Sequence, residues 1–186
     1  MNTTKLPAAE RSPFALRLER INRLIGRTIA WLTLVMVLVT VVVVVQRYWF
    51  ANGSIRLQES ITFMHAAVFM LAAAYTLAAG DHVRVDIYYS TMQPRAKAIV
   101  DIAGTLCLLM PFCAFLIWSS WDYVGTSWQI EETSQESSGL PYPFPAVLKS
   151  FMPLAAALLF LQGIVILLDC YRVLAHRNSA ASETRQ

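Results

Sequence analysis

The stretch "IAWLTLVMVLVTVVVVV", residues 29–45, contains no charged side chain and decides the fold class. A helix that crosses a bilayer needs about 20 mostly apolar residues. Together with its neighbours, this stretch predicts a transmembrane helix over about 28–50. Valine has only modest helix propensity in water, but lipid offers the backbone no hydrogen-bonding partner, so a helix is still expected.

Three more apolar stretches predict membrane spans at about 57–79, 98–121 and 147–169. The composition agrees, because 56% of the 186 residues are hydrophobic and only 15% are charged. A soluble domain carries about 25% charged residues. The sequence therefore predicts an all-α integral membrane protein with four transmembrane helices, embedded in a lipid bilayer.

Prolines and turn residues refine this picture. Pro111 falls inside the third span and is expected to bend it, whereas Pro153 falls in the first turns of the fourth, where it costs less. Residues 52–54 (Asn-Gly-Ser) form a turn signal, and Pro94 suits a first helical position. Short interfacial helices are expected to begin after the turn and near Pro94.

Loop charges predict the orientation. In a four-span chain, most basic residues fall on one side, in segments 1–27, 80–97 and 171–186. The other side holds Arg47, Arg56 and Lys149, together with most of an acidic loop. Because positive loops stay in the cytoplasm, both termini are expected there, in a bacterial inner membrane.

This orientation divides the chain into three parts. Residues 1–27 form a cytoplasmic N-terminal segment, residues 28–170 form the membrane domain, and residues 171–186 form a cytoplasmic tail.

Few residues suggest chemistry. The three cysteines lack metal or redox spacing, and no phosphate loop, hydrolase motif or nucleic-acid surface occurs. The charged residues of the spans fall near predicted helix ends, whereas a transporter usually exposes polar groups near the midplane. We therefore expect no enzymatic activity, no cofactor, no metal and no nucleic-acid partner.

Glu59 and His65 are the two ionisable groups of the second span that invite a functional interpretation. Glu59 is a candidate coupling carboxylate, but we favour a place at the outer helix end, near the positive end of the helix dipole. His65 is a candidate proton relay or haem ligand. We favour a neutral histidine that is hydrogen-bonded to a neighbouring helix.

The segment "GDHVRVDIYYS", residues 80–90, alternates polar and apolar residues. A lone strand in lipid would leave backbone groups unpaired, so the segment is expected at the cytoplasmic interface. We predict an extended connector in which His82, Arg84 and Asp86 face water or a partner. A metal site there is disfavoured, because an extended stretch rarely fixes ligand geometry.

Three features together resemble the small membrane subunit (small permease, Q-type) of tripartite ATP-independent periplasmic (TRAP) transporters. They are "AAAYTLAAGDHVRVDIYYSTMQPRAKAIVDIAGTL" (72–106), "SSGLPYPFPAVLKSFMPLAAALLFLQG" (137–163), and four spans with both ends cytoplasmic. The resemblance covers about residues 24–170. The acidic loop before the second stretch is similar to the branch assigned to keto acids, mannitol or chloroaromatic compounds.

The resemblance implies a secondary transporter of three parts. A periplasmic binding protein captures an organic acid, and a large membrane subunit moves it, usually driven by sodium. The small subunit supports the large one and adds to the surface on which the binding protein docks.

By motif position, His82, Arg84 and Asp86 mark the cytoplasmic connector. Five further residues mark the start of the fourth span: Gly139, Leu140, Pro141, Lys149 and Pro153. Their implied role is structural or at a subunit interface. Two other classes stay open, a self-sufficient small transporter and the membrane-anchor subunit of a redox complex.

Overall fold

The computed structural model describes residues 13–79, 89 and 91–183, and over these residues it contains helices and loops but no strand. The main elements follow in chain order: α1 (Pro13–Trp49), α2 (Ile55–Ala79), α4 (Pro94–Gly104), the π-helical turn η2 (Thr105–Leu109), α5 (Met110–Gln129) and α6 (Phe144–Glu183).

Four helical stretches are long and apolar enough to cross a membrane: Pro13–Trp49, Ile55–Ala79, Arg95–Gln129 and Phe144–Ala175. The predicted all-α class with four spans is therefore confirmed. The first and last helices extend beyond the predicted spans, into the more polar residues beside the apolar stretches.

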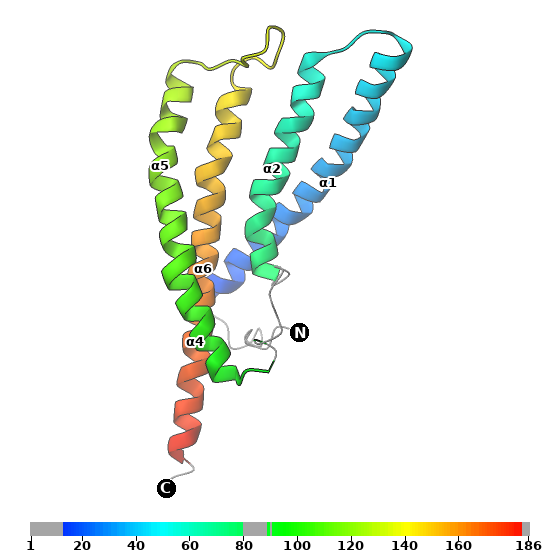
Figure 1. Ribbon diagram of the computed structural model, residues 1–186. Coiled ribbons are helices and arrows are strands. Elements are labelled where there is room, and N and C mark those ends of the chain that lie inside the picture. The colour runs from blue at the N-terminus through cyan, green and yellow to red at the C-terminus, as the bar shows by residue number, and fades with distance from the viewer. Residues whose placement is uncertain (1–12, 80–88, 90, 184–186) are drawn as a thin grey trace.

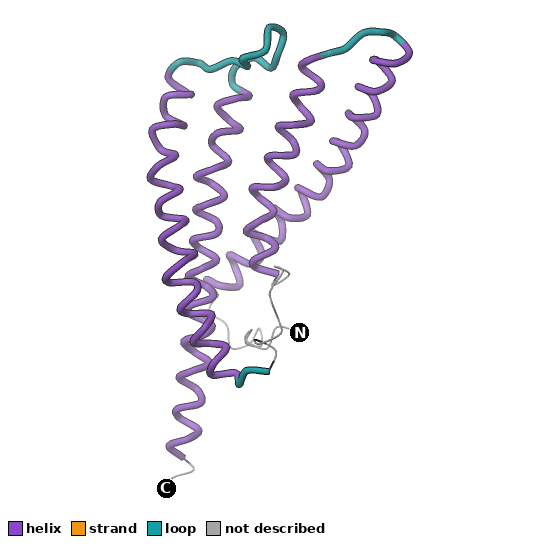
Figure 2. The backbone as a smooth tube through the Cα atoms, in the orientation of Figure 1, coloured by secondary structure: helices purple, strands orange, loops and turns teal. Residues whose placement is uncertain are grey.

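The helices form two antiparallel pairs, α1 with α2 and α5 with α6, and α2 also packs against α6 (Figure 1). The loops of residues 50–54 and 130–143 lie together at one end of the molecule, which we call the loop end. The start of α1 and the end of α6 lie toward the opposite end. Loops occupy only the ends of the described helices (Figure 2).

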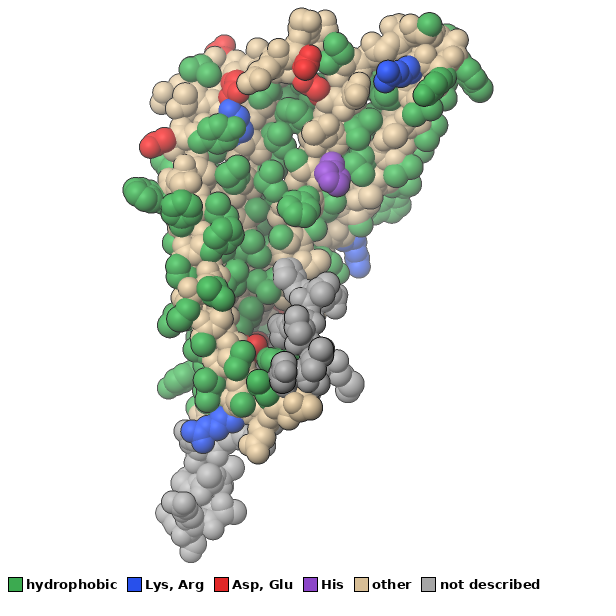
Figure 3. All heavy atoms as spheres, viewed as in Figure 1, with side chains coloured by type: hydrophobic (Ala, Val, Ile, Leu, Met, Phe, Trp, Pro, Cys, Tyr) green, Lys and Arg blue, Asp and Glu red, His purple; other side chains and the backbone are tan. Residues whose placement is uncertain are grey.

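Small side chains form much of the packed interior. The buried face of α2 consists of Ala67, Ala74 and Ala78. A Cβ atom added at Gly26 of α1 would lie 2.5 Å from the ring of Tyr75 on α2, so the two helices touch closely at this point. Large apolar side chains instead cover the outside (Figure 3), where a bilayer or another membrane subunit would surround them.

The third span departs from regular α geometry just before Pro111. A proline inside a helix lacks the N–H that would bond four residues back, and its ring crowds that carbonyl. The turn before it widens into η2, and the N–H of Met110 bonds to the carbonyl of Thr105. The sequence predicted a bend at Pro111, and the structure has a π turn just before this proline.

Two sequence expectations change in detail. The expected interfacial helices near residues 55 and 94 are the first turns of continuous helices, since α2 starts at Ile55 and α4 continues through η2 into α5. Pro153 lies inside α6, because this helix begins at Phe144, earlier than the predicted span. Pro153 therefore lies in the interior of the helix and not in its first turns.

Candidate functional site

Polar side chains with long-range partners gather at the loop end. Most acidic side chains visible on the face drawn in Figure 3 lie near this end, above a largely apolar surface. The loop of residues 130–143 connects α5 to α6, and its contacts also reach α2. It therefore joins the two helix pairs at the loop end.

Glu59 of α2 holds one side of this loop. Its Oε2 atom accepts a hydrogen bond from the backbone N–H of Leu140 at 2.7 Å, and its Oε1 atom accepts one from the hydroxyl of Ser134. The N–H of Ser134 in turn donates to the carbonyl of Leu140 at 3.0 Å. One carboxylate thus closes the loop and fastens it to another helix pair.

Gly139 is needed where the carboxylate meets the loop. A Cβ atom at this position would lie 2.7 Å from Oε2 of Glu59 and closer still to the side chain of Ser134. Any larger residue would push the loop away from α2. In the "GLP" motif, residues 139–141, the close contacts therefore explain why the first residue is glycine.

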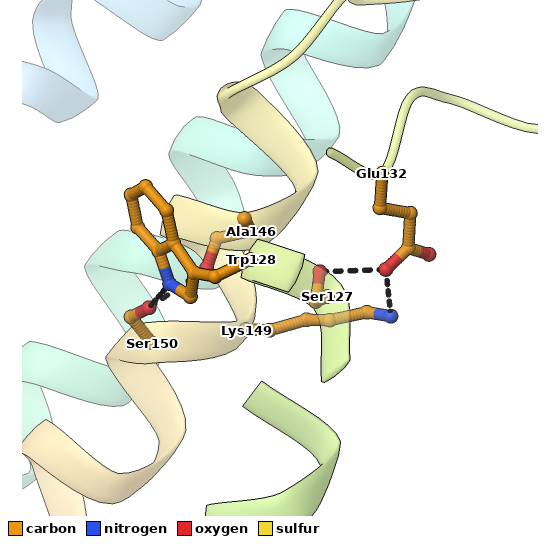
Figure 4. Close-up of polar contacts among 6 residues, drawn as sticks. All are labelled: Ser127, Trp128, Glu132, Ala146, Lys149 and Ser150. Carbon is orange, nitrogen blue, oxygen red and sulfur yellow. Dashed lines mark hydrogen bonds and ion pairs between the residues drawn. The ribbon is translucent and has the colours of Figure 1, made fainter. Parts of the chain in front are cut away.

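Glu132 holds the other side of the loop against α5 and α6 (Figure 4). Its Oε2 atom accepts hydrogen bonds from the ammonium group of Lys149 and, at 2.6 Å, from the hydroxyl of Ser127. The Lys149 Nζ atom also lies 4.1 Å from the centroid of the Tyr123 ring. The hydrogen bond from Lys149, followed by that from Ser127, lowers the pKa of the Glu132 carboxyl below its usual range.

Trp128 makes a third contact between the end of α5 and the start of α6 (Figure 4). Its indole N–H donates to the hydroxyl oxygen of Ser150 at 3.0 Å, and that hydroxyl donates to the carbonyl of Ala146 at 2.8 Å. The Trp128 ring also meets Tyr142 edge to face, with centroids 5.9 Å apart. The end of α5, the loop and the start of α6 are thus one connected polar and aromatic cluster.

A second polar tie joins the helix pairs away from the loop end. The amide nitrogen of Asn22 on α1 donates to the side-chain oxygen of Gln162 on α6 at 3.1 Å, and both side chains are buried.

Nearer the connector between α2 and α4, the Tyr89 hydroxyl donates to Asp101 at 2.8 Å. The Lys97 ammonium lies 5.3 Å from the centroid of the Tyr89 ring.

The structure separates the site residues that the sequence singled out. It brings Glu59 together with Gly139 and Leu140, whereas Lys149 takes part in the neighbouring Glu132 cluster. His65 is exposed on α2 and has no hydrogen bond to a described residue. The predicted connector residues His82, Arg84 and Asp86 lie outside the described residues.

The sequence placed Glu59 at a helix end but did not predict its contacts. The first turn of α2 contains no acidic residue, and Glu59 follows that turn and turns its carboxylate to the loop. The sequence also gave no role to several residues with long-range bonds: Asn22, Ser127, Trp128, Glu132, Ser134, Ser150 and Gln162. The one available signal was Lys149 close to an acidic loop, and it did not distinguish Glu132 from Glu131 or Glu136.

Over the described ranges, no group of three or more His, Cys, Asp or Glu residues is placed to hold a metal ion. The side chains of Glu59 and Glu132 instead bind groups of the loop end and hold its shape.

The family model for "Tripartite ATP-independent periplasmic transporters, DctQ component" matches residues 36–173. The chain belongs to this family. The match includes the loop end, the last part of α1, all of α2, α4 and α5, and most of α6. No curated protein and no solved structure shows significant similarity to the chain.

The DctQ component is part of a transporter that also contains a large permease and a binding protein. The chain is therefore the small permease component of a TRAP transporter, a multi-pass membrane protein. This confirms the family resemblance found in the sequence.

Proposed function

We propose that this DctQ component is the accessory inner-membrane subunit of a secondary-active transporter that takes up an organic acid. The observation that carries the proposal is the family match over residues 36–173. The loop end faces the periplasm and both termini lie in the cytoplasm. The excess of basic residues outside the loop end supports this orientation.

One role of the subunit is to support the large permease. Many large apolar side chains lie on the outside of the helices, among them Trp31, Phe69 and Leu108. Such a surface is compatible with both lipid and another membrane subunit. Substrate selection and ion coupling, which we expect to use sodium in symport, reside in the other components.

A second role is to add a periplasmic contact for the binding protein. Glu131 and Glu136 are exposed in the loop, and Asp122 is exposed on α5 seven residues before the helix ends. None of the three has an ion pair with a described residue. The Glu59 and Glu132 clusters hold the same region in a fixed shape. We expect these acids to meet basic groups on the binding protein, which would speed encounter more than it strengthens binding.

Reconstitution of the three components tests the subunit role. In mild detergent, the chain should co-purify with the large permease. In liposomes, uptake should need both membrane subunits and the binding protein, and the DctQ component alone should show no flux. Robust uptake by the lone chain would instead support a self-sufficient transporter.

The docking role is tested separately in the assembled transporter. Combined Asp122→Asn, Glu131→Gln and Glu136→Gln changes should raise the concentration of binding protein needed for half-maximal uptake, most strongly at low salt. Alanine at the exposed neutral neighbours Gln129 and Gln135 is the matched control. Equal effects of both sets would contradict an electrostatic contact.

A further inference from the structure

Helix α2 has two contrasting faces. Its buried face carries alanines and packs against α1 and α6. The opposite face exposes Gln58, Thr62, His65 and Phe69, and we call these four residues the polar face of α2. Their spacing of three or four residues places them on a single stripe along the helix.

The polar face extends well into the predicted membrane span. His65 follows the first residue of α2 by ten positions, which corresponds to about 15 Å along the helix axis. The hydrocarbon core of a bilayer is about 30 Å thick. His65 therefore lies closer to the middle of α2 than to either end of the helix.

Exposed hydroxyl groups on α1 do not need an outside partner. Thr28 donates to the carbonyl of Leu24 at 3.1 Å, and Thr40 donates to that of Met36 at 2.8 Å. These threonines can face lipid, because their own helix satisfies them.

On the polar face of α2, no such hydrogen bond to the helix's own carbonyl groups is present. The side chains of Gln58, Thr62 and His65 make no hydrogen bond to any residue in the described ranges. Polar groups without a partner are costly in lipid, and in membrane proteins they usually face protein or water. A stripe of such groups on an exposed face therefore indicates a protein surface that covers it.

We propose that the polar face of α2 binds a membrane-embedded helix of the large permease subunit. This inference rests on the proposed function, because family membership supplies the large permease as the membrane partner. The partner helix presents hydroxyl, carbonyl, amide or carboxylate groups opposite Thr62 and His65. Phe69, which is 75% exposed, packs against apolar groups of the same helix.

The same helix also carries the attachment of the loop. Glu59, next to Gln58 in the chain, binds Ser134 and Leu140 at the loop end. Helix α2 therefore connects the large permease to the surface proposed to receive the binding protein. This continuity favours the large permease over a second copy of this chain as the occupant.

Affinity between the purified subunits tests the proposal. The double variant Thr62→Val/His65→Leu should weaken binding to the large permease roughly tenfold, within the range expected for two interhelical hydrogen bonds. His65→Asn, which keeps a donor and an acceptor, should retain most of the affinity. Thr40→Val on α1 is the matched control, because its hydroxyl bonds only to its own helix.

Each outcome is distinct. Failure of the wild-type chain to bind the large permease overturns the proposed function itself. Wild-type binding that Thr62→Val/His65→Leu leaves unchanged overturns only this inference.

Two further measurements separate the remaining explanations. The lone double variant should unfold at the wild-type temperature, and a large drop in its unfolding temperature would indicate contacts within the chain. A photo-crosslinking residue at position 69 should capture the large permease, whereas a homodimeric adduct would assign the face to self-association.

Discussion

The carboxylate of Glu59 accepts the backbone N–H of Leu140 at 2.7 Å, although 81 positions separate the two residues in the chain. The bond joins the start of α2 to the loop between α5 and α6. It therefore connects the two helix pairs at the end where the binding protein is proposed to dock.

Glu59→Gln tests this tie. In the glutamine amide an NH2 donor replaces one carboxylate oxygen, so either Ser134 or Leu140 loses the oxygen that accepts its hydrogen bond. We expect a loss of about 1–3 kcal/mol in stability, since hydrogen bonds to charged groups are strong. Thermal unfolding in detergent and limited proteolysis of residues 130–143 measure the effect. Glu136→Gln, an exposed acid of the same loop, should leave both unchanged.

Gly139→Ala tests the steric fit of the loop. The added Cβ would approach Oε2 of Glu59 at 2.7 Å, so the loop must shift or break its bond. We expect a destabilisation of about 1–3 kcal/mol and faster cleavage of the loop. Gly53→Ala is the control, because no atom lies within 4 Å of its added Cβ. Equal stability of the two variants would argue against the close fit.

The Glu132 cluster predicts a specific pH dependence. Because folding lowers the pKa of this carboxyl, its contribution is complete above the unfolded value of about 4.3. The contribution is lost as the pH falls through the lower pKa of the folded protein. Glu132→Gln should therefore be less stable than wild type at neutral pH, and the difference should vanish in strong acid.

Melting temperatures measured from pH 7 down to the acid limit of reversible unfolding check this expectation. Glu131→Gln is the matched control, because Glu131 is an exposed neighbour that makes no ion pair with a described residue. A difference between wild type and Glu132→Gln that stays constant with pH would contradict the ionic contact with Lys149.

Asn22 and Gln162 predict energetic coupling between α1 and α6. Asn22→Leu and Gln162→Leu should each destabilise the chain, because each leaves a buried polar partner without its hydrogen bond. The double variant should lose less than the two single losses combined. A double-mutant cycle from thermal unfolding should give a coupling of about 0.5–2 kcal/mol. A loss in the double variant that equals the sum of the two single losses would show that Asn22 and Gln162 are not energetically coupled.

Local sequence patterns were enough to predict the spans. An uncharged stretch such as residues 29–45 can cross lipid only as a helix, whatever surrounds it. Helix ends were harder to predict, since α1 and α6 extend into polar segments that the hydropathy pattern excludes. At Pro111 the sequence predicted a bend and did not predict the π turn that precedes the proline.

The candidate site was predictable only in part. The "GLP" motif and Glu59 were each noticed, but their contact depends on how the α5–α6 loop folds back onto α2. His65 was expected to bond to a neighbouring helix, yet no described helix of this chain supplies that partner. Its exposure became informative only when compared with Thr40, which bonds to its own helix.

The sequence by itself determined the membrane class, the four spans and the family, because apolar length and motif order are local properties of the chain. Only the tertiary structure decided that Glu59 fastens the loop, that Glu132 binds Lys149 and that Asn22 meets Gln162. Each of these contacts joins residues from different elements. Their geometry follows from helix packing, which places distant side chains within hydrogen-bonding distance and leaves the polar face of α2 exposed.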